Sequence, residues 1–305
     1  PERMITGFNG SDRDIEIRNV TFQYEGIHSP KVLERINLKI PRGKITAIVG
    51  TSGSGKTTLI KCLIGVLKPD EGEVAFEGED ITKNPREYRC NIGYMAQYAT
   101  YYPVYTVYEF MQYICALNEI KKGQRDQLIR DVLKEVNLLD EKDKKIRNLS
   151  GGMRQRLGLA QVIIKDPDII ILDEPTAGLD VIARDSILEL LREYMETEGR
   201  SILISSHISS DLESLCDDIY MIDKGRIVLH ENTDVLLDEY GLIKADEKQY
   251  ELLDKQHILK VKKEQYGYSC LTDERAFYAE NYPQLAIERG SVDKVITMMI
   301  KGEVL

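Results

Sequence analysis

The sequence predicts an α/β fold, in which a parallel β-sheet is covered by helices. After residue 150, helix and strand patterns alternate, at residues 152–165, 168–172, 181–197 and 201–205. Such alternation is typical of parallel strands joined by helical crossovers. An unbroken run of four branched apolar residues, at 169–172, indicates a buried strand. A glycine-rich turn at residues 50–57 joins another apolar strand to a helix, which adds a further strand-to-helix unit.

The chain before this alternation predicts an N-terminal antiparallel β subdomain. Residues 15–24 alternate and are rich in branched and aromatic side chains, which favours a strand. Further strands are expected at residues 36–40, 45–49 and 73–77, with Pro41-Arg42-Gly43 as a turn between the first two. A helix is expected from Lys56 to about residue 66. Residues 1–14 are predicted to be a polar tail.

A helical subdomain is expected at about residues 98–158, inside a main domain that spans residues 15–240. Two apolar series at helical spacing support it: Val107, Phe110, Met111, Ile114 and Leu117, then Leu128, Val132, Leu133 and Val136. Residues 241–305 are predicted to be a small α+β extension. Within it residues 257–262 alternate as a strand does, and Gly302 is suited to end a helix marked by Val292, Val295, Ile296 and Met299.

Composition argues against several classes of protein. The net charge of −10 over 305 residues disfavours broad nucleic-acid binding, which normally requires a basic face. No apolar stretch approaches the roughly 20 residues that cross a bilayer, so any membrane role is expected to come through a partner. The five cysteines are scattered without close pairs, which favours a reducing cytosol over a disulfide framework.

Residues 50–57, Gly-Thr-Ser-Gly-Ser-Gly-Lys-Thr, have the pattern of a loop that binds a triphosphate. The glycines let backbone N–H groups point at phosphate oxygens, and the helix that follows adds a favourable dipole. Lys56 is expected to reach the β and γ phosphates, and the Thr57 hydroxyl to ligate Mg²⁺. A chance glycine-rich turn is the alternative, which the strand before it and the helix after it disfavour. The predicted ligands are Gly50, Ser52, Gly53, Ser54, Gly55, Lys56, Thr57 and Thr58.

Two acids, Asp173 and Glu174, end the apolar strand at residues 169–172. Asp173 is expected to hold the water shell of Mg²⁺. Glu174 is placed to polarise an attacking water, a general-base role that is typically worth about 10²–10⁴-fold in rate. A solvated acidic turn is the alternative. The phosphate loop upstream and the sequence Pro-Thr-Ala-Gly-Leu-Asp at residues 175–180 favour the catalytic interpretation.

The segment at residues 149–157, Leu-Ser-Gly-Gly-Met-Arg-Gln-Arg-Leu, is the most informative part of the chain. Ser150 offers a hydroxyl, and Gly151 and Gly152 offer backbone donors at the start of a helix. By itself the segment is a capped helix start. Together with the phosphate loop and the acidic strand end, it resembles the signature motif of the ATP-binding cassette (ABC) family. Met153 departs from the commonest form of that motif, which has glutamine there.

The resemblance to an ABC nucleotide-binding domain covers about residues 15–234 and implies a P-loop NTPase core that hydrolyses ATP with Mg²⁺. By this resemblance Tyr24 would stack on adenine, and Gln97 would sense Mg²⁺ and the attacking water. His207, after a predicted strand, would contact the γ-phosphate. Asp180 would link the two sites of a dimer, and Ser150, Gly151 and Gly152 would contact ATP held by a second copy.

The implied partners are therefore a second copy of the chain and integral membrane transporter subunits, at the cytoplasmic face of the plasma membrane. The tyrosine-rich residues 98–105 would face the membrane subunit, with local packing as the alternative. Residues 94–117 and 298–303 look most similar to bacterial exporters of peptides or antibiotics. Export of a peptide, antibiotic or lipid-like substrate is expected. An importer subunit, or a soluble ABC ATPase acting on ribosomes or DNA, are the alternatives.

Overall fold

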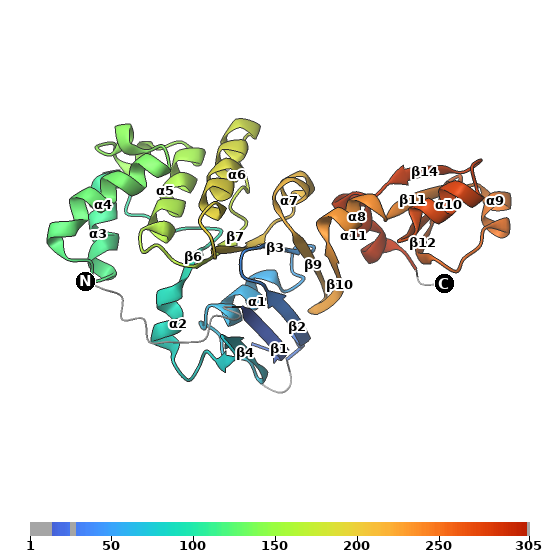
Figure 1. Cartoon of the computed structure of the whole chain (residues 1–305), viewed down its shortest axis with the longest axis horizontal. Coiled ribbons are helices and arrows are strands. Elements are labelled where there is room, and N and C mark those ends of the chain that lie inside the picture. Colours follow the sequence, from blue (N-terminus) through green and yellow to red (C-terminus); the bar gives the residue numbers. More distant parts are fainter. Residues whose placement is uncertain (1–13, 25–28, 304–305) are drawn as a thin grey trace.

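The computed structural model describes residues 14–24 and 29–303, whose strands form three β-sheets with helices around them (Figure 1). The mixed α/β class that the sequence predicts is confirmed. Residues 1–13 of the predicted tail lie outside the described residues.

A six-stranded sheet with the order β10-β9-β3-β8-β7-β6 lies at the centre of the molecule. All of its strands are parallel except the edge strand β10, which runs antiparallel to β9. Every residue of β3, β7 and β8 is buried, which explains their nearly continuous apolar sequence. The bounds are β3 (Ile45–Val49), β6 (Ile92–Met95), β7 (Ile169–Asp173), β8 (Ser201–Ser205), β9 (Asp218–Asp223) and β10 (Arg226–Asn232).

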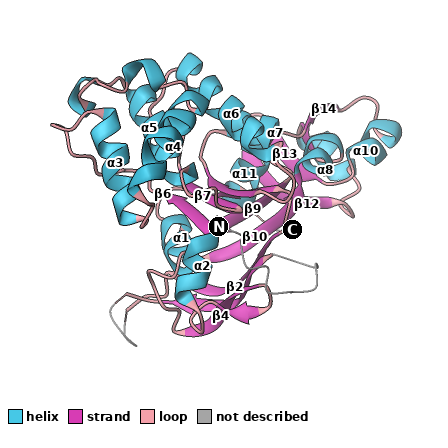
Figure 2. Cartoon of the chain, turned by 60° about the vertical axis from the view of Figure 1, so that its left-hand side comes forward, coloured by secondary structure: helices cyan, strands magenta, loops and turns pink. Residues whose placement is uncertain are grey.

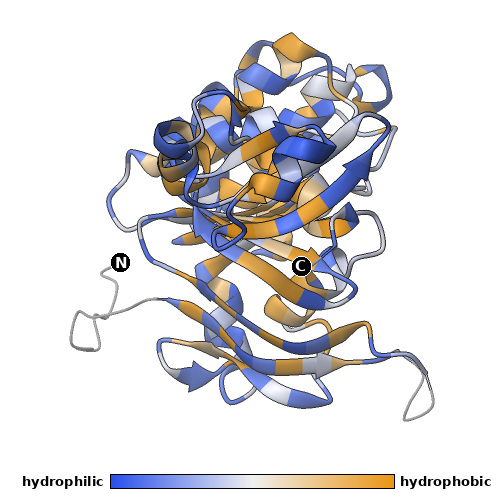
Figure 3. Cartoon of the chain, turned by 90° about the vertical axis from the view of Figure 1, so that its right-hand side faces the viewer, coloured by the Kyte–Doolittle hydropathy of each residue, from blue (hydrophilic) through white to orange (hydrophobic). Residues whose placement is uncertain are grey.

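Alternate residues of the central strands enter two different hydrophobic cores, one on each face of the sheet. Ile48 and Ile171 belong to the core formed with α1 (Lys56–Leu63) and the N-terminal antiparallel sheet. Ala47 and Leu172 belong to the core formed with the helices of the opposite face. Figure 3 shows hydrophobic residues gathered along these central strands. The sheet therefore holds the ends of its strands in fixed positions.

The antiparallel sheet has the order β2-β1-β4-β5 and covers the α1 side. Its strands are β1 (Ile15–Phe22), β2 (Leu33–Ile40), β4 (Glu71–Phe76) and β5 (Glu79–Asp80). Helix α1 ends before the predicted residue 66 because Gly65 takes a left-handed backbone (φ 69°) and donates its N–H to the Cys62 carbonyl. A short helix that the sequence patterns did not indicate, α2 (Pro85–Asn91), is tied to α1 because the Tyr88 hydroxyl donates to the Leu63 carbonyl at 2.6 Å.

The core on the other face of the central sheet includes residues of α3 (Val107–Leu117), α4 (Lys122–Glu135), α5 (Gly151–Ile163) and α6 (Val181–Met195). Helix α3 starts at a capping box in which Thr106 and Glu109 accept each other's backbone N–H groups. Glu119, with a left-handed backbone (φ 58°), lies in the connection from α3 to α4. Short 3₁₀ turns at Leu139–Glu141 and Ile146–Asn148 lead into α5.

Beyond β10, α8 (Thr233–Asp238) leads to a third sheet with the order β12-β13-β11-β14. Its elements are β11 (Gly241–Ala245), α9 (Glu247–Leu252), β12 (Ile258–Glu264), β13 (Gly267–Thr272), α10 (Arg275–Asn281), β14 (Ala286–Arg289) and α11 (Val292–Lys301). Helix α11 ends just before Gly302, whose backbone is extended rather than left-handed (φ −82°). It lies beside α7 (Ser209–Leu215), as Figures 1 and 2 show.

Candidate nucleotide-binding site

A cavity of about 510 Å³ lies where residues 50–57 leave β3 and enter α1. Gly55 caps α1 with a left-handed backbone (φ 113°), and a Cβ atom there would lie 3.1 Å from the Val32 carbonyl oxygen. Only glycine fits this position without strain. Most of the predicted site residues line this cavity: Gly50, Ser52, Gly53, Gly55, Lys56, Thr57, Thr58, Gln97, Asp173, Glu174 and His207. Val32 and Thr51, which were not predicted, also line it. Ser54 is buried beside it, and its hydroxyl has no hydrogen-bond partner among the described residues.

Lys56 is buried, and its ammonium donates to the carbonyl oxygens of Gly50 at 2.7 Å and Thr51 at 3.1 Å. Burial lowers the pKa of Lys56, while the charges of Glu174 and Asp173 act in the opposite direction. The loop carbonyls thus hold the ammonium inside the cavity. An anion that enters would meet a cation that is already desolvated.

Asp173, at the end of β7, is fixed through both of its carboxylate oxygens. The Ser205 hydroxyl donates to Oδ1 at 2.6 Å, and the Thr57 hydroxyl donates to Oδ2 at 3.1 Å. Ser205 is fully buried at the end of β8, directly opposite Asp173 in the parallel ladder. Sequence reasoning did not single out Ser205 for this contact. The only signal was its position at the end of the neighbouring predicted strand.

Glu174 and His207 form the closest side-chain pair in the cavity: Nδ1 of His207 lies 2.6 Å from Oε2 of Glu174. Glu174 is buried and has a left-handed backbone (φ 52°), which is uncommon for a residue with a side chain. Its N–H donates to both the carbonyl and the hydroxyl of Ser205, at 3.1 and 3.0 Å. Local backbone strain of this kind is concentrated at functional sites.

Tyr24 lies beside the phosphate loop, where its hydroxyl is 3.0 Å from that of Thr58. Its ring packs edge-on against Phe22 and is 54% exposed. An aromatic face next to a phosphate loop is available for stacking against a base. Val32, which also lines the cavity, was missed by the sequence analysis because it carries no motif and precedes the second strand.

Ser150, Gly151, Gly152 and Asp180 do not line this cavity. They lie at the starts of two neighbouring helices. The Ser150 hydroxyl accepts from the Met153 N–H at 3.2 Å and caps α5, and the Asp180 carboxylate accepts from the Ala183 N–H at 2.9 Å and caps α6. A Cβ atom on Gly152 would lie 2.9 Å from that of Ala183, so glycine lets the two helix starts approach. The side chain of Met153 packs against the main core.

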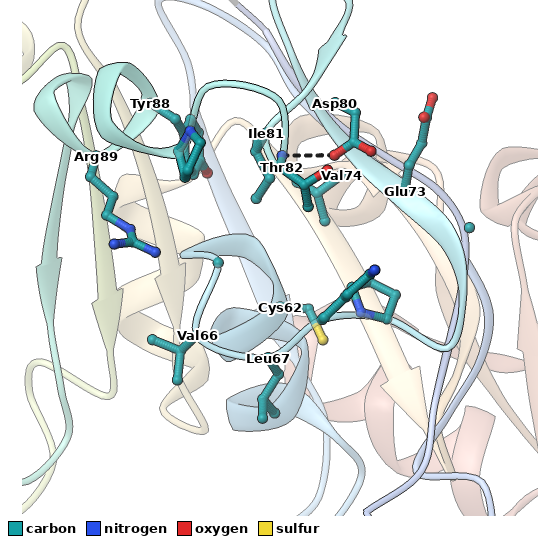
Figure 4. Close-up of a pocket in the computed structure, with 15 residues that line it drawn as sticks. Cys62, Val66, Leu67, Glu73, Val74, Asp80, Ile81, Thr82, Tyr88 and Arg89 are labelled. Atoms are coloured by element: carbon teal, nitrogen blue, oxygen red, sulfur yellow. Dashed lines mark hydrogen bonds between the residues drawn. The ribbon is translucent and has the colours of Figure 1, made fainter. Parts of the chain in front are cut away.

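A second cavity, of about 250 Å³, lies between the end of α1, β4 and α2, where Figure 4 shows its lining side chains. Cys62 and Val74 contribute apolar surface, and Arg89 and Asp80 contribute charge. None of the predicted site residues lines it. The proposed ATP site is therefore the phosphate-loop cavity, which the predicted residues Lys56, Asp173 and Glu174 line.

Within residues 14–24 and 29–303, no group of three or more His, Cys, Asp or Glu side chains forms a metal centre. Oxygen atoms that suit a hard cation are nevertheless gathered at Thr57 and Asp173, and Gln97 lines the same cavity.

Residues 33–177 match the family model described as ABC transporter. The chain is 33% identical to the ABC transporter ATP-binding protein NatA of Bacillus subtilis over 199 residues, which are 65% of this chain and 80% of that protein. It is 34% identical to the Nod factor export ATP-binding protein I of Burkholderia orbicola over 212 residues, 70% of this chain and 68% of that protein. It is 35% identical to the methionine import ATP-binding protein MetN of Mannheimia succiniciproducens over 200 residues, 64% of this chain and 58% of that protein.

Solved structures show the same likeness. The chain resembles cbiO1 of Clostridium perfringens, part of the ABC transporter complex cbiONQ, with a TM-score of 0.66, 29% identity, and coverage of 72% of this chain and 88% of that one. It also resembles a dimeric ATP-binding cassette in a post-hydrolysis state, bound to ADP and phosphate, with a TM-score of 0.64, 26% identity, and coverage of 72% and 98%. The chain belongs to the ATP-binding proteins of ABC transporters, and it is an ATPase.

Proposed function

We propose that two copies of this chain enclose two ATP molecules and drive an exporter whose membrane-embedded subunits are separate proteins. One observation carries the proposal of a pair. The phosphate-loop cavity holds Lys56, Glu174 and His207, whereas Ser150 and its glycines lie on another surface of the same chain. A second copy would bring its Ser150 to the open side of the cavity. The Ser150 oxygen already accepts a helix N–H, which leaves its own proton free to donate to a phosphate oxygen.

The proposed reaction is attack of water on the γ-phosphorus of ATP. A bond forms between the water oxygen and phosphorus, the bond from phosphorus to the β–γ bridging oxygen breaks, and ADP and inorganic phosphate leave. Glu174 takes a proton from the attacking water, as a general base does. Lys56 stabilises the charge of the β and γ phosphates, and His207 holds the Glu174 carboxylate while it contacts the γ-phosphate.

Mg²⁺ is proposed to accompany ATP, because Thr57, Asp173 and Gln97 offer oxygen atoms at one side of the cavity. When bound, the ion would neutralise charge on the β and γ phosphate oxygens. Ser205 would then orient Asp173 toward the ion's water shell, since it holds the other carboxylate oxygen.

An exposed aromatic surface supports docking to a membrane subunit. Tyr98 is 83% exposed and directly follows Gln97, and Tyr102 stacks on Tyr105 with ring centres 5.1 Å apart. Tyr101 behaves differently: its hydroxyl donates to the Arg154 carbonyl, and burial raises its pKa to about 12. Part of residues 98–105 therefore packs locally and part is open to a partner. None of the described helices is long and apolar enough to span a bilayer.

Export of a peptide, antibiotic or lipid-like substrate is the finer proposal. It is supported by the likeness to the Nod factor export protein and by the exporter-like sequence of residues 94–117. The methionine import protein is equally similar, so an importer subunit is the rival. A transport assay distinguishes an exporter from an importer, if it uses inside-out membrane vesicles, whose ATPase subunits face the outer solution. Uptake of substrate into such inside-out vesicles upon ATP addition supports export, and ATP-driven release contradicts it.

Copurification tests the proposal of a membrane partner. The tagged full chain, extracted in mild detergent, is expected to bring down an integral membrane protein. Replacing Tyr98 and Tyr102 by serine should reduce this recovery while the ATPase rate of the isolated chain stays unchanged. Tyr266→Ser is the matched control, because Tyr266 is 86% exposed and lies between β12 and β13 of the extension. Recovery with ribosomes or DNA in place of a membrane protein would contradict the proposal and favour a soluble ABC ATPase.

A further inference from the structure

Helix α7 connects the proposed catalytic pair to the C-terminal extension. His207 precedes this helix by two residues, and the Ile208 N–H donates to the Ser206 hydroxyl in the intervening turn. The side chain of His207 is 60% exposed, so it has little packing of its own. Its position next to Glu174 therefore depends on where α7 holds the backbone.

The first turns of α7 are bonded to the start of α11 in the extension. The Ser209 hydroxyl donates to the Asp293 carboxylate, and the Glu213 carboxylate accepts from the Val292 N–H at 2.7 Å. The second contact places a negative charge on the N-terminus of α11, where the helix dipole favours it. Both contacts join residues about eighty positions apart in the sequence.

The same two helices share a hydrophobic core. Val292, Val295 and Met298 of α11 are buried with Leu212 of α7, in the cluster that also contains Leu172 of β7. The extension is thus packed into the core of the ATPase domain through α11. A shift of α11 would move atoms that are in van der Waals contact with α7, because protein interiors are close-packed.

The opposite side of α7 is hydrogen-bonded to the loop that follows β7 and carries Glu174. The Thr176 hydroxyl donates to the buried Asp211 carboxylate at 2.7 Å, and Arg184 of α6 lies 3.9 Å from the same carboxylate. Thr176 is two residues beyond Glu174. Helix α7 is therefore held between the loop that carries Glu174 and the extension that carries Asp293.

We propose that the C-terminal extension positions the His207–Glu174 pair through α7, with Asp293 and Ser209 as positioning residues. This inference rests on the proposed catalytic role of that pair. The extension would set the rate of the chemical step rather than the affinity for ATP, since none of its residues lines the phosphate-loop cavity. It would also give any partner that binds the extension a route to the ATPase site.

Two single variants in the full chain test the proposal from either side of the contact, Ser209→Ala and Asp293→Ala. Each removes one hydrogen bond, and each is expected to lower kcat about three- to tenfold. The Kd for ATP, measured by equilibrium binding, should not change. Lys294→Ala is the matched control on α11, because the Lys294 ammonium contacts residues of the extension itself: it pairs with Glu288 at 2.8 Å and donates to the Arg289 carbonyl at 3.1 Å. Unchanged kcat in both test variants would overturn the inference.

A double-mutant cycle with His207→Ala separates positioning from general destabilisation. If Ser209 and Asp293 act through His207, their replacement should have no further effect on single-turnover hydrolysis once His207 is absent. Additive losses would overturn the inference, because the effect would then bypass His207. The proposed catalytic pair is tested separately: full activity of both His207→Ala and Glu174→Gln would refute the pair itself. If Ser209→Ala and Asp293→Ala are fully active while His207→Ala and Glu174→Gln are not, only the positioning role is refuted.

Discussion

Nδ1 of His207 lies 2.6 Å from Oε2 of Glu174, so the two residues that the sequence placed 33 positions apart form one hydrogen-bonded unit. With the carboxylate ionised, this bond requires a proton on Nδ1 and leaves Nε2 for another partner. The left-handed backbone of Glu174 and the two bonds from its N–H to Ser205 fix the carboxylate end of the unit. The pair is thus built from the ends of two adjacent parallel strands.

Glu174→Gln is expected to abolish turnover while it preserves ATP binding. The amide oxygen can still accept from His207, but the amide cannot take a proton from water, so the rate should fall about 10²–10⁴-fold. Phosphate release measures the loss, and size-exclusion chromatography with ATP should show a trapped pair of chains. Glu198→Gln, at an exposed position in the turn after α6, is the control. A variant that hydrolyses ATP at the normal rate would remove Glu174 from the base role.

Tyr24→Ala is expected to weaken ATP binding by about 1–3 kcal/mol, the usual contribution of one base stacked on an aromatic ring. Tyr24→Phe keeps the ring and loses only the hydroxyl contact to Thr58, so it should bind nearly as tightly as the parent chain. Fluorescence titration with an ATP analogue measures both. Equal affinities of the alanine and phenylalanine variants would argue against stacking at this position.

The sequence predicted the parts of the site that lie within single strand-to-loop units. The loop at residues 50–57 and the two acids at the end of β7 could be predicted locally, because each motif includes the strand that positions it. Ser205 could not be assigned, because its contact with Asp173 depends on which strands are neighbours in the sheet. The contact between Ser209 and Asp293 joins two helices, α7 and α11, that are separated in the sequence by all four strands of the third sheet. Sequence patterns indicate which face of a helix is apolar but not which distant element covers it.

The lowered pKa of Lys56 predicts opposite pH dependences for ATP binding and for folding. Consider the pH interval between the pKa of Lys56 in the folded chain and its ordinary value of 10.5. In this interval the unfolded chain binds more protons at Lys56 than the folded chain does, so the contribution of Lys56 to the free energy of unfolding increases with pH. ATP needs the charged ammonium, so the advantage of Lys56 in binding should decline over the same interval. Lys56→Met gives the reference: the ratio of its Kd to that of the parent chain should decrease as pH rises toward 10.5. A ratio that stays constant to that pH would contradict the shift.

Gly152→Ala and Gly151→Ala should separate packing from phosphate contact in the signature segment. A Cβ atom at residue 152 would lie 2.9 Å from that of Ala183, so this variant should lose about 1–3 kcal/mol of unfolding free energy through overpacking of α5 against α6. At residue 151 the nearest atom is a methyl of Leu179 at 3.8 Å, an ordinary contact, so the fold should be as stable as before. Gly151 is also proposed to contact the γ-phosphate of ATP held by a second copy. The Gly151→Ala variant should then be stable but hydrolyse ATP slowly. Urea unfolding and phosphate release, measured on both variants, give this contrast, and equal stability losses in the two would refute the packing argument.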